Sequence, residues 1–465
     1  MSASVTAAFA PFAAKMQAAG LPQLAIDSFR VHFEQYRRGA TGLMPEASIT
    51  PVDDVPDAGA LASYAAAGRR ALEHAVVVKL NGGLGTSMGL SAAKSLLPAK
   101  DGHSFLDLIV RQVLHLRETY ACGLPLVLMN SFRTREDSRR VLARYPQLAT
   151  GLPADFLQHK VPRIRKSDDT PVVWPANPEH EWCPPGHGDI YPALVTSGLL
   201  PALRGRGIRW AFVSNSDNLG AVLDLGILGW IVSEQIPFVM EVADRREADR
   251  KGGHLARGAD GRLVLRETAQ CPREDERAFQ DVRRHRYFNT NNLWIDLEVL
   301  ARVLDERQGI LGLPLITNEK PVDPEDPSSP RVVQLETAMG AAIAVFAGAR
   351  ALRVPRGRLV PVKTTSDLLT LWSDAYDLAD DFRVVLSPRR TEPDLVVDLD
   401  PTYYRQVGDL EARFPDGAPS LVTCRRFVVR GDVHFGGGVV VEGDVTVRRD
   451  GPGPHRVAAG TMLRG

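Results

Sequence analysis

The sequence predicts an α/β fold, and three observations support this prediction. Short apolar runs alternate with helical segments from about residue 74 to residue 380, as in proteins built on a largely parallel sheet. A polar or glycine-rich segment follows three of these runs, at the position where such sheets bind ligands. From residue 385 onward the alternation stops and a short valine-rich repeat takes its place. The apolar runs lie at residues 76–78, 125–129, 210–213 and 238–242.

The N-terminal residues predict helices. Residues 4–38 place apolar side chains such as Phe9, Phe12 and Phe29 at helical spacing. A stretch rich in proline and aspartate follows at residues 50–57 and predicts a loop. We therefore expect a helical N-terminal segment over residues 1–73, followed by a catalytic α/β domain over residues 74–384.

The most informative stretch is residues 76–97, where an apolar strand leads into a loop with four glycines and then Lys94. Glycine lets backbone N–H groups approach a ligand closely, and such groups form a nest for phosphate oxygens, to which a following helix would add its positive end. The expected ligand is a nucleotide phosphate. The loop lacks the Gly-Lys-Ser/Thr of a Walker A loop, and its Gly83-Leu-Gly85 start leaves open a dinucleotide loop or a ligand-free turn.

Two later segments have the composition of ligand-binding loops. Residues 182–191 hold two prolines and two glycines around His187 and Asp189, which predicts either a rigid ligand-contacting loop or a structural turn with a capping aspartate. Asp217 comes just after the apolar run at 210–213. Such a carboxylate can ligate Mg²⁺, although an Asx turn is the structural alternative.

A sugar and a second phosphate contact are predicted further along the chain. Residues 288–294 contain three asparagines, whose amides can pair with sugar hydroxyls, unless they only form a turn. Gly253 and Glu267 would complete such a pocket. Lys363 stands just before Thr-Ser-Asp, a pattern that predicts a helix N-cap, so this lysine is either a phosphate ligand or a solvated side chain.

The C-terminal residues 385–465 are expected to form a separate module. Val-Arg-Gly-Asp-Val at 429–433 recurs as Val-Glu-Gly-Asp-Val at 441–445. The spacing of twelve residues equals two hexapeptides, which is typical of a parallel β-helix. An ordinary hairpin is the alternative.

Composition excludes several classes of protein. The 56 basic and 56 acidic residues balance, which argues against a nucleic-acid partner. No run of 18 apolar residues and no signal peptide is apparent, so we expect no membrane span. The four cysteines lie far apart without a CxxC pair, which fits a cytoplasmic protein without disulfides or structural zinc.

Taken together, these segments resemble the eukaryotic-type UTP–glucose-1-phosphate uridylyltransferases, also called UDP-glucose pyrophosphorylases. The motifs follow the family's order along roughly 300 residues. The resemblance implies a nucleotide-diphospho-sugar transferase fold, which is a Rossmann-like mixed-sheet α/β core with a C-terminal left-handed parallel β-helix. The matching motifs are Lys79–Gly89, Lys94–Leu96, Pro125–Phe132, Pro184–Tyr191, Phe288–Trp294, Gln334–Ala338 and Pro361–Leu368.

The resemblance also implies roles for single residues. Lys94 would contact the nucleotide phosphates and Lys363 would bridge the phosphates, which makes these two lysines the expected catalytic cations. Asp217 would ligate Mg²⁺, the expected cofactor, and His187 would meet the sugar phosphate. The hexose would bind to Gly253, Glu267 and Asn291. The other nucleotide-binding residues would be Leu80, Asn81, Gly82, Gly83, Gln158, Gly186, Asn215 and Ser216.

The implied reaction joins UTP and glucose 1-phosphate into UDP-glucose and pyrophosphate. Because the attacking phosphate is already an anion, catalysis needs positioning and charge neutralisation rather than a general base. A related enzyme for another sugar 1-phosphate, a nicotinamide-dependent dehydrogenase and a non-catalytic sugar-nucleotide-binding module are the alternatives.

The sequence departs from the family pattern at three places. Ala92-Ala93 stand where the family has Gly-Pro, and Ser216 replaces an apolar residue. The C-terminal module is shorter than usual, although association through it into a homo-oligomer is still an arrangement that the resemblance suggests.

Overall fold

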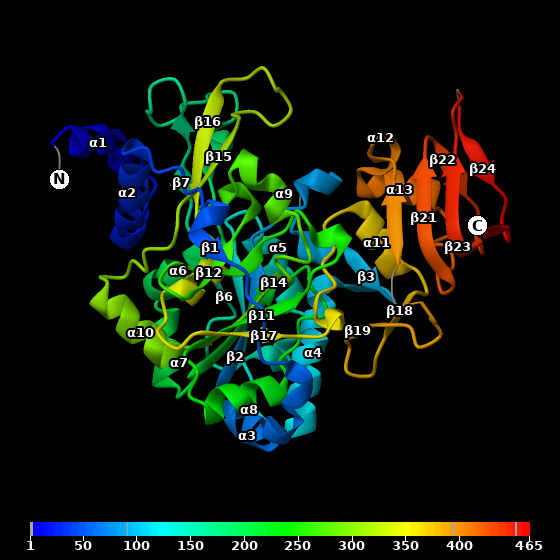
Figure 1. Ribbon diagram of the computed structural model, residues 1–465, viewed down its shortest axis with the longest axis horizontal. Coiled ribbons are helices and arrows are strands. Elements are labelled where there is room, and N and C mark those ends of the chain that lie inside the picture. The colour runs from blue at the N-terminus through cyan, green and yellow to red at the C-terminus, as the bar shows by residue number, and fades with distance from the viewer. Residues whose placement is uncertain (1–2, 91, 393–394, 452) are drawn as a thin grey trace.

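The structure is a computed structural model that describes residues 3–90, 92–392, 395–451 and 453–465. Figure 1 shows the N-terminal helices at one end of the molecule, the C-terminal strands at the other, and the central sheet between them. The predicted helical lead-in is confirmed, since α1 (Ala3–Ala18) and α2 (Gln23–Arg37) occupy it. Phe12 of α1 packs against Phe33 of α2 with ring centroids 4.8 Å apart and the ring planes tilted by 48°, and both rings belong to a small separate core.

A ten-stranded sheet forms the centre of the described chain. Its main order is β1-β12-β14-β10-β2-β5-β6, while β11 pairs with β14 and β17, and β13 pairs with β12. The strands are β1 (Ile49–Thr50), β2 (Ala75–Asn81), β5 (Leu126–Asn130), β6 (Asp155–Leu157), β10 (Trp210–Asn215), β11 (Phe238–Asp244), β12 (His254–Gly258), β13 (Leu263–Arg266), β14 (Tyr287–Asp296) and β17 (Arg350–Arg353).

The sheet is mixed, as the resemblance implies, and the expectation of a largely parallel sheet is wrong. Strands β10, β2, β5 and β6 pair in parallel, as do β11 and β17. Strand β14 runs antiparallel to β10, β11 and β12. The reason is the hairpin of β12 and β13, which carries the chain away from β11 and back, so β14 returns alongside β11 without the long crossover that parallel pairing needs.

Helices cover both faces of the sheet, because successive residues of its strands point to opposite sides. In β2, Val77 packs into one buried cluster, whereas Val76 and Val78 pack into the other. The first face is covered by α3 (Ala65–Ala71), α4 (Phe105–Tyr120) and α8 (Leu225–Ser233). The second face is covered by α6 (Ile190–Thr196), α7 (Leu199–Gly205) and α10 (Leu297–Glu306).

The C-terminal residues contain only parallel strand pairs from β20 onward among the described residues. A four-stranded sheet has the order β20-β21-β23-β25, and β22 pairs with β24. The elements are α11 (Thr365–Trp372), β20 (Val396–Leu399), α12 (Pro401–Tyr404), α13 (Val407–Arg413), β21 (Cys424–Arg430), β22 (Val433–Phe435), β23 (Val440–Arg448), β24 (His455–Val457) and β25 (Met462–Arg464).

The parallel pairing decides between the two expectations for this region. An ordinary hairpin is wrong, because β21 and β23 run in the same direction. The repeat of twelve residues is not the pairing distance either, because Val429 lies beside Val447, eighteen positions further on. A left-handed β-helix is not confirmed, since the described strands form two parallel sheets rather than a complete solenoid.

Short elements at the periphery complete the fold. Strands β15 and β16 project from the central body near the N-terminal helices (Figure 1). None of the described helices is long and apolar enough to cross a membrane. The remaining helices and strands are β3 (Pro98–Lys100), β4 (His103–Ser104), α5 (Arg135–Leu142), β7 (Val161–Pro162), β8 (Ile164–Arg165), β9 (Trp182–Cys183), α9 (Glu276–Phe279), β15 (Ile316–Pro321), β16 (Arg331–Glu336), β18 (Tyr376–Leu378) and β19 (Val384–Leu386).

Candidate active site

The predicted site segments meet at one edge of the central sheet. Parallel pairing sets Asn81 beside Asn130 and Leu80 beside Asn215, so the carboxyl ends of β2, β5 and β10 lie side by side. Strand β14 extends past the end of β10, and its register with Val213 at Leu293 brings Asn291 to the same edge. The predicted segments therefore lie along this edge in the order of the strands, from the hairpin of β12 and β13 at one end to β6 at the other.

The glycine-rich loop is built as predicted, but its described residues, 82–90 and 92–97, contain no α-helix behind the glycines. Gly85 and Gly89 have φ of 56° and 77°, a conformation that glycine adopts without strain. Two 3₁₀ turns, at Thr86–Met88 and Lys94–Leu96, follow in place of a helix. Phosphate binding here would therefore depend on loop N–H groups and on Lys94, whose own N–H donates to the Gly83 carbonyl at 3.1 Å.

Lys94 and Asp217 form an ion pair at the centre of this edge. The Lys94 ammonium donates to Asp217 Oδ2 at 2.7 Å, and the two side chains are 15% and 21% exposed. The Asp217 carbonyl accepts a hydrogen bond from the Val362 N–H at 3.2 Å, which fixes the neighbouring Lys363 segment to the same loop. The expected cation and the expected metal ligand are thus in direct contact.

The nucleotide residues beside this pair fall into two groups. An ideal Cβ on Gly82 would lie 2.7 Å from Gln158 Oε1, whereas one on Gly83 would meet nothing within 4 Å. Gly82 and Gln158 therefore form one wall and Gly83 faces open space. The side chain of Asn81 is engaged within the fold, because the residue is 2% exposed and its Nδ2 donates to the side chains of Asn130 and Ser138, each at 2.7 Å. Any contact of Asn81 with a nucleotide would therefore come through its backbone.

Three predicted residues hold the adjoining strand ends in place. Leu80 accepts a hydrogen bond from the Ser216 N–H at 3.0 Å, and Asn215 accepts one from the Asn218 N–H at 3.3 Å. Ser216 is 7% exposed, so the serine that departs from the family pattern lies largely inside the fold. The contribution of these residues to a ligand would come mainly through the shape of the backbone.

The loop at Gly186 and His187 is rigid. Gly186 has φ of 81°, and a Cβ there would lie 2.4 Å from the Thr337 carbonyl oxygen. His187 Nδ1 accepts a hydrogen bond from the Met339 N–H at 2.9 Å. Burial lowers the pKa of His187 to about 4. The ring is therefore neutral near pH 7 with its proton on Nε2, where it can donate to a ligand oxygen.

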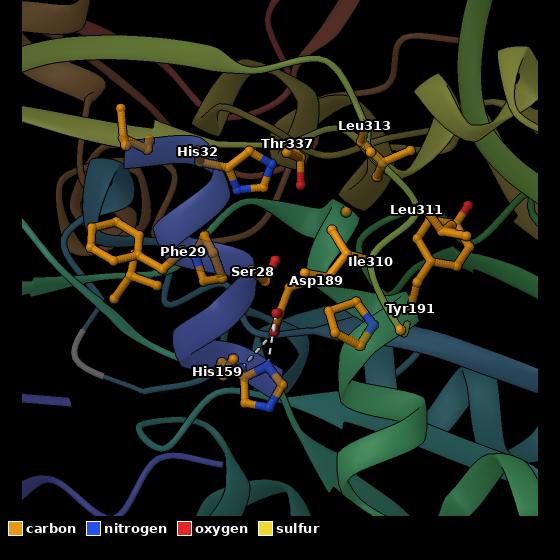
Figure 2. A pocket seen from close by; sticks show the side chains of 18 residues that line it. Ser28, Phe29, His32, His159, Asp189, Tyr191, Ile310, Leu311, Leu313 and Thr337 are labelled. Carbon is orange, nitrogen blue, oxygen red and sulfur yellow. Dashed lines mark hydrogen bonds and ion pairs between the residues drawn. The ribbon is translucent and has the colours of Figure 1, made fainter. Parts of the chain in front are cut away.

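A cavity lies behind this loop, between α2 and the segment 309–313 (Figure 2). Asp189 points into it and accepts hydrogen bonds from the backbone and the ring of His159, at 2.6 and 2.8 Å. The described residues that line the cavity include Pro185, Gly188 and Asp189 of the predicted loop, but not Gly186 or His187. The Asp189 carboxylate therefore holds His159 in place, and the cavity adjoins the loop from the side opposite to the predicted ligand.

The predicted sugar residues come together next to Lys363. A Cβ on Gly253 would lie 2.5 Å from Glu267 Oε2. Burial raises the pKa of the Glu267 carboxyl, although a hydrogen bond from Asn289 and the charge of Lys363 oppose the shift. Asn291 has φ of 58° and its Oδ1 accepts from Asn289 Nδ2 at 2.9 Å. Two amides and one carboxyl group thus form a compact polar cluster.

Lys363 itself extends from the start of a capped helix. The predicted N-cap is confirmed, since Thr364 and Asp367 form a capping box at the start of α11. The Lys363 N–H donates to Asp367 Oδ2 at 2.8 Å, whereas the side chain is exposed. The backbone of Lys363 is therefore fixed, whereas its exposed side chain can move the ammonium group toward a ligand.

Sequence reasoning did not identify the buried charges beneath the site. The Lys79 ammonium donates to Ser214 Oγ and the Ala221 carbonyl, both at 2.7 Å, across the loop that carries Asp217. Burial lowers the pKa of Lys79 to about 7. Glu241 is fully buried and pairs with Arg358 at 2.6 and 2.8 Å. The sequence pattern that could have indicated these buried charges is Lys79 itself, which stands between Val78 and Leu80 in an otherwise apolar run.

These features define an α/β protein whose candidate ligand site lies at the carboxyl edge of its sheet. The family model described as UTP–glucose-1-phosphate uridylyltransferase matches residues 26–442, and the chain belongs to this family. The enzyme of that name from Hordeum vulgare is 42% identical over 378 residues, which cover 81% of this chain and 77% of the relative. A probable one from Schizosaccharomyces pombe is 39% identical, with coverage of 86% and 76%.

Solved structures agree with this assignment over nearly the whole chain. The UDP-glucose phosphorylase of Trypanosoma brucei superposes with a TM-score of 0.91 at 43% identity and 98% coverage of both chains. A variant of the Leishmania major UDP-glucose pyrophosphorylase, solved in complex with UDP-glucose, superposes with a TM-score of 0.92 at 44% identity, again with 98% coverage of both.

Proposed function

We propose that this protein is a Mg²⁺-dependent enzyme that makes UDP-glucose and pyrophosphate from UTP and glucose 1-phosphate. The observation that carries the proposal is the order of groups along the sheet edge. Gly82 and Gln158 lie toward β6, the polar cluster of Gly253, Glu267 and Asn289 lies toward β12, and the ion pair of Lys94 with Asp217 lies between them. Two ligands bound at the two ends would bring their phosphates together at the ion pair.

The nucleotide would occupy the end near β6. Gly82 has no side chain to block a planar base. The amide of Gln158 suits such a base, since an amide supplies both a donor and an acceptor. Gly83, which faces open space, would let the backbone approach the ribose or the phosphates. Lys94 would then leave Asp217 and contact the nucleotide phosphates as a point charge.

The sugar phosphate would occupy the other end. Its hydroxyls would pair with Glu267, with Asn291 and with the backbone at Gly253. Neutral His187 would donate a hydrogen bond from Nε2 to the phosphate. Because the ring is not an acid at neutral pH, it would leave the attacking phosphate oxygen unprotonated. The exposed ammonium of Lys363 would reach over the phosphates from the start of α11.

Chemistry at this centre requires charge neutralisation more than proton transfer. A phosphate oxygen of glucose 1-phosphate forms a bond to the α-phosphorus of UTP, the bond to the β-phosphate oxygen breaks, and pyrophosphate leaves with its charge. Lys94 and Lys363 would hold both anions in line and stabilise the charge that develops on the leaving group.

A magnesium ion fits the residues at this position. Asp217 offers a single, partly exposed carboxylate at a strand end, and Mg²⁺ in such sites is commonly held by one or two carboxylates together with substrate phosphates. No group of three or more His, Cys, Asp or Glu side chains that could hold a metal alone occurs among the described residues. When bound, the ion would neutralise and orient the phosphate oxygens.

We further propose a division of the chain into three parts, an association mode and a location. The domain boundaries that we propose are 1–73, 74–384 and 385–465, which include residues 1–2, 91, 393–394 and 452 outside the described part of the chain. A short β-helix in the last of these is supported by the parallel pairing of Val429 with Val447, since eighteen residues make three hexapeptides. We also propose association through this module and a cytoplasmic location, the latter supported by four free cysteines.

Pyrophosphate release over a panel of substrates tests the proposal. Purified protein is mixed with each of UTP, ATP, CTP and GTP and with the 1-phosphates of glucose, galactose and N-acetylglucosamine, with magnesium or with a chelator. We expect rapid release only with UTP, glucose 1-phosphate and magnesium together. Faster release with another sugar would favour the related enzyme, and no release with any pair would refute both.

A further inference from the structure

The two ends of the hairpin formed by β12 and β13 carry residues of the proposed sugar pocket. Gly253 directly precedes β12, and Glu267 directly follows β13. His254 pairs with Arg266 at the base of this hairpin, which sets Gly253 and Glu267 side by side. The geometry of the pocket therefore depends on how the base of the hairpin is held.

A stretch of the N-terminal segment contacts the hairpin at its tip and near its base. We call residues 44–50 the clasp. At the hairpin tip, β1 adds a strand to β12, with Ile49 beside Gly258. Near the base, the Met44 N–H donates to the Gln270 carbonyl at 2.7 Å, and Gln270 caps the turn that begins at Glu267.

Glu46 is the charged centre of the clasp. Its Oε2 accepts a hydrogen bond from Arg266 Nη1 at 2.6 Å, and Arg266, the residue before Glu267, has a fully buried side chain. Its Oε1 accepts hydrogen bonds from Arg284 at 2.6 Å and from His285 at 3.0 Å. One carboxylate thus joins the hairpin base to the segment that leads into β14.

Asp275, the second partner of Arg266, also contacts Glu46. The Glu46 N–H donates to Asp275 Oδ2 at 2.6 Å, and this oxygen also accepts from Arg266 Nη2 at 3.3 Å. Burial on its own would raise the pKa of Glu46, but the hydrogen bonds from Arg284, His285 and Arg266 outweigh it and keep the pKa below its usual range. Glu46 is therefore ionised at neutral pH and forms a closed network with these groups.

We propose that Glu46 is a positioning residue for the sugar pocket, acting through Arg266 on Glu267 and Gly253. Loss of its charge would leave the buried Arg266 guanidinium with a weaker partner, which is costly inside a protein, and the hairpin base would shift to compensate. The nucleotide end of the site lies beyond β14, β10 and β2 in the sheet order. Among the described residues, the hydrogen bonds and ion pairs of the clasp join it to the hairpin and to the segments that flank it, not to Gly82, Gly83 or Gln158. This inference rests on the proposed function.

The test compares Glu46→Gln with the parent enzyme in both substrates. We expect the KM for glucose 1-phosphate to rise at least tenfold, while the KM for UTP changes less than twofold. Glu46→Asp, which keeps the charge on a shorter side chain, should recover part of the loss. Asp57→Asn is the matched control, because Asp57 is also in the N-terminal segment and pairs at 2.6 Å with Arg353, away from the hairpin; both KM values should stay near the parent's.

A second readout does not depend on activity. Hydrogen exchange of backbone amides in residues 254–267 should become faster in Glu46→Gln and stay unchanged in Asp57→Asn. If Glu46→Gln does not fold, Arg284→Ala removes one partner that is 46% exposed and should give the same pattern with smaller changes. Equal rises in both KM values, or unchanged exchange in the hairpin, would overturn the inference. An inactive parent enzyme would instead refute the proposed function, and the exchange result would still decide the role of Glu46.

Discussion

The ion pair between Lys94 and Asp217 gives the sharpest prediction about catalysis. Replacing Lys94 with methionine keeps the length of the side chain and removes its charge. Loss of one preorganised donor to a developing charge typically costs about 2.7–4 kcal/mol of transition-state stabilisation, or a factor of about 10²–10³ in kcat. We therefore expect Lys94→Met to reduce kcat by at least about a hundredfold.

The burial of the ion pair also limits how much Lys94→Met can reduce the free energy of unfolding. The side chains of the pair are 15% and 21% exposed, so their interaction lies between that of a surface pair, at about 0–1 kcal/mol, and that of a buried pair broken at one partner, at about 3–5 kcal/mol. A loss of about 1–3 kcal/mol in the free energy of unfolding follows from these two bounds. Most of the protein should thus remain folded while turnover falls.

A kinetic double-mutant cycle measures the effect. Initial rates of pyrophosphate release are compared for the parent, Lys94→Met, Asp217→Asn and the double variant, with Lys94→Arg as the control that keeps the charge. Groups that act on the same transition-state charge are not additive, so the double variant should be little worse than the more damaging single one. A Lys94→Met enzyme with kcat within threefold of the parent would refute this reasoning.

Four further predictions concern single residues. Asp217→Asn should raise the magnesium concentration for half-maximal rate at least tenfold, and an unchanged titration would remove Asp217 from the metal site. Gly83→Ala should raise the KM for UTP at an unchanged melting temperature, because its Cβ meets only open space in the free protein; an unaltered KM argues against ligand contact there. His187, with a pKa of about 4, should stay neutral from pH 5 to 8 in an NMR titration of labelled histidine, whereas a midpoint near 6.5 would contradict its burial. Lys79 holds fewer protons folded than unfolded between its pKa of about 7 and its ordinary 10.5, so it makes the free energy of unfolding rise with pH in that window; Lys79→Met should flatten this rise in denaturant titrations, and an equal slope would contradict it.

Local patterns in the sequence predicted much of the site. The glycine loop, the helix cap beside Lys363 and the strand ends near Asp217 each depend on residues close together in the chain. Glycine spacing, capping residues and apolar runs report such local geometry directly. The structure accordingly brings these segments to one edge of the sheet, as expected.

Long-range pairing explains what the sequence did not reveal. Asn81 looks like a ligand residue in its motif, yet its amide is used between β2, β5 and α5. Lys79 and Glu241 become neighbours of the site only when β2, β10 and β11 assemble. The hexapeptide repeat pointed to parallel strands, but the actual partner of Val429 lies eighteen residues away. Such contacts depend on packing between distant segments, which single-sequence patterns do not report.

The fate of each phosphate of UTP tests the central claim most directly. Purified protein is incubated with magnesium, glucose 1-phosphate and UTP that carries radioactive phosphorus at either the α- or the γ-position, and the products are separated. Uridylyl transfer predicts that the α-label moves into UDP-glucose while the γ-label leaves in pyrophosphate, in equal amounts. Label from the γ-position in a sugar product, or no labelled UDP-glucose at all, would contradict the account.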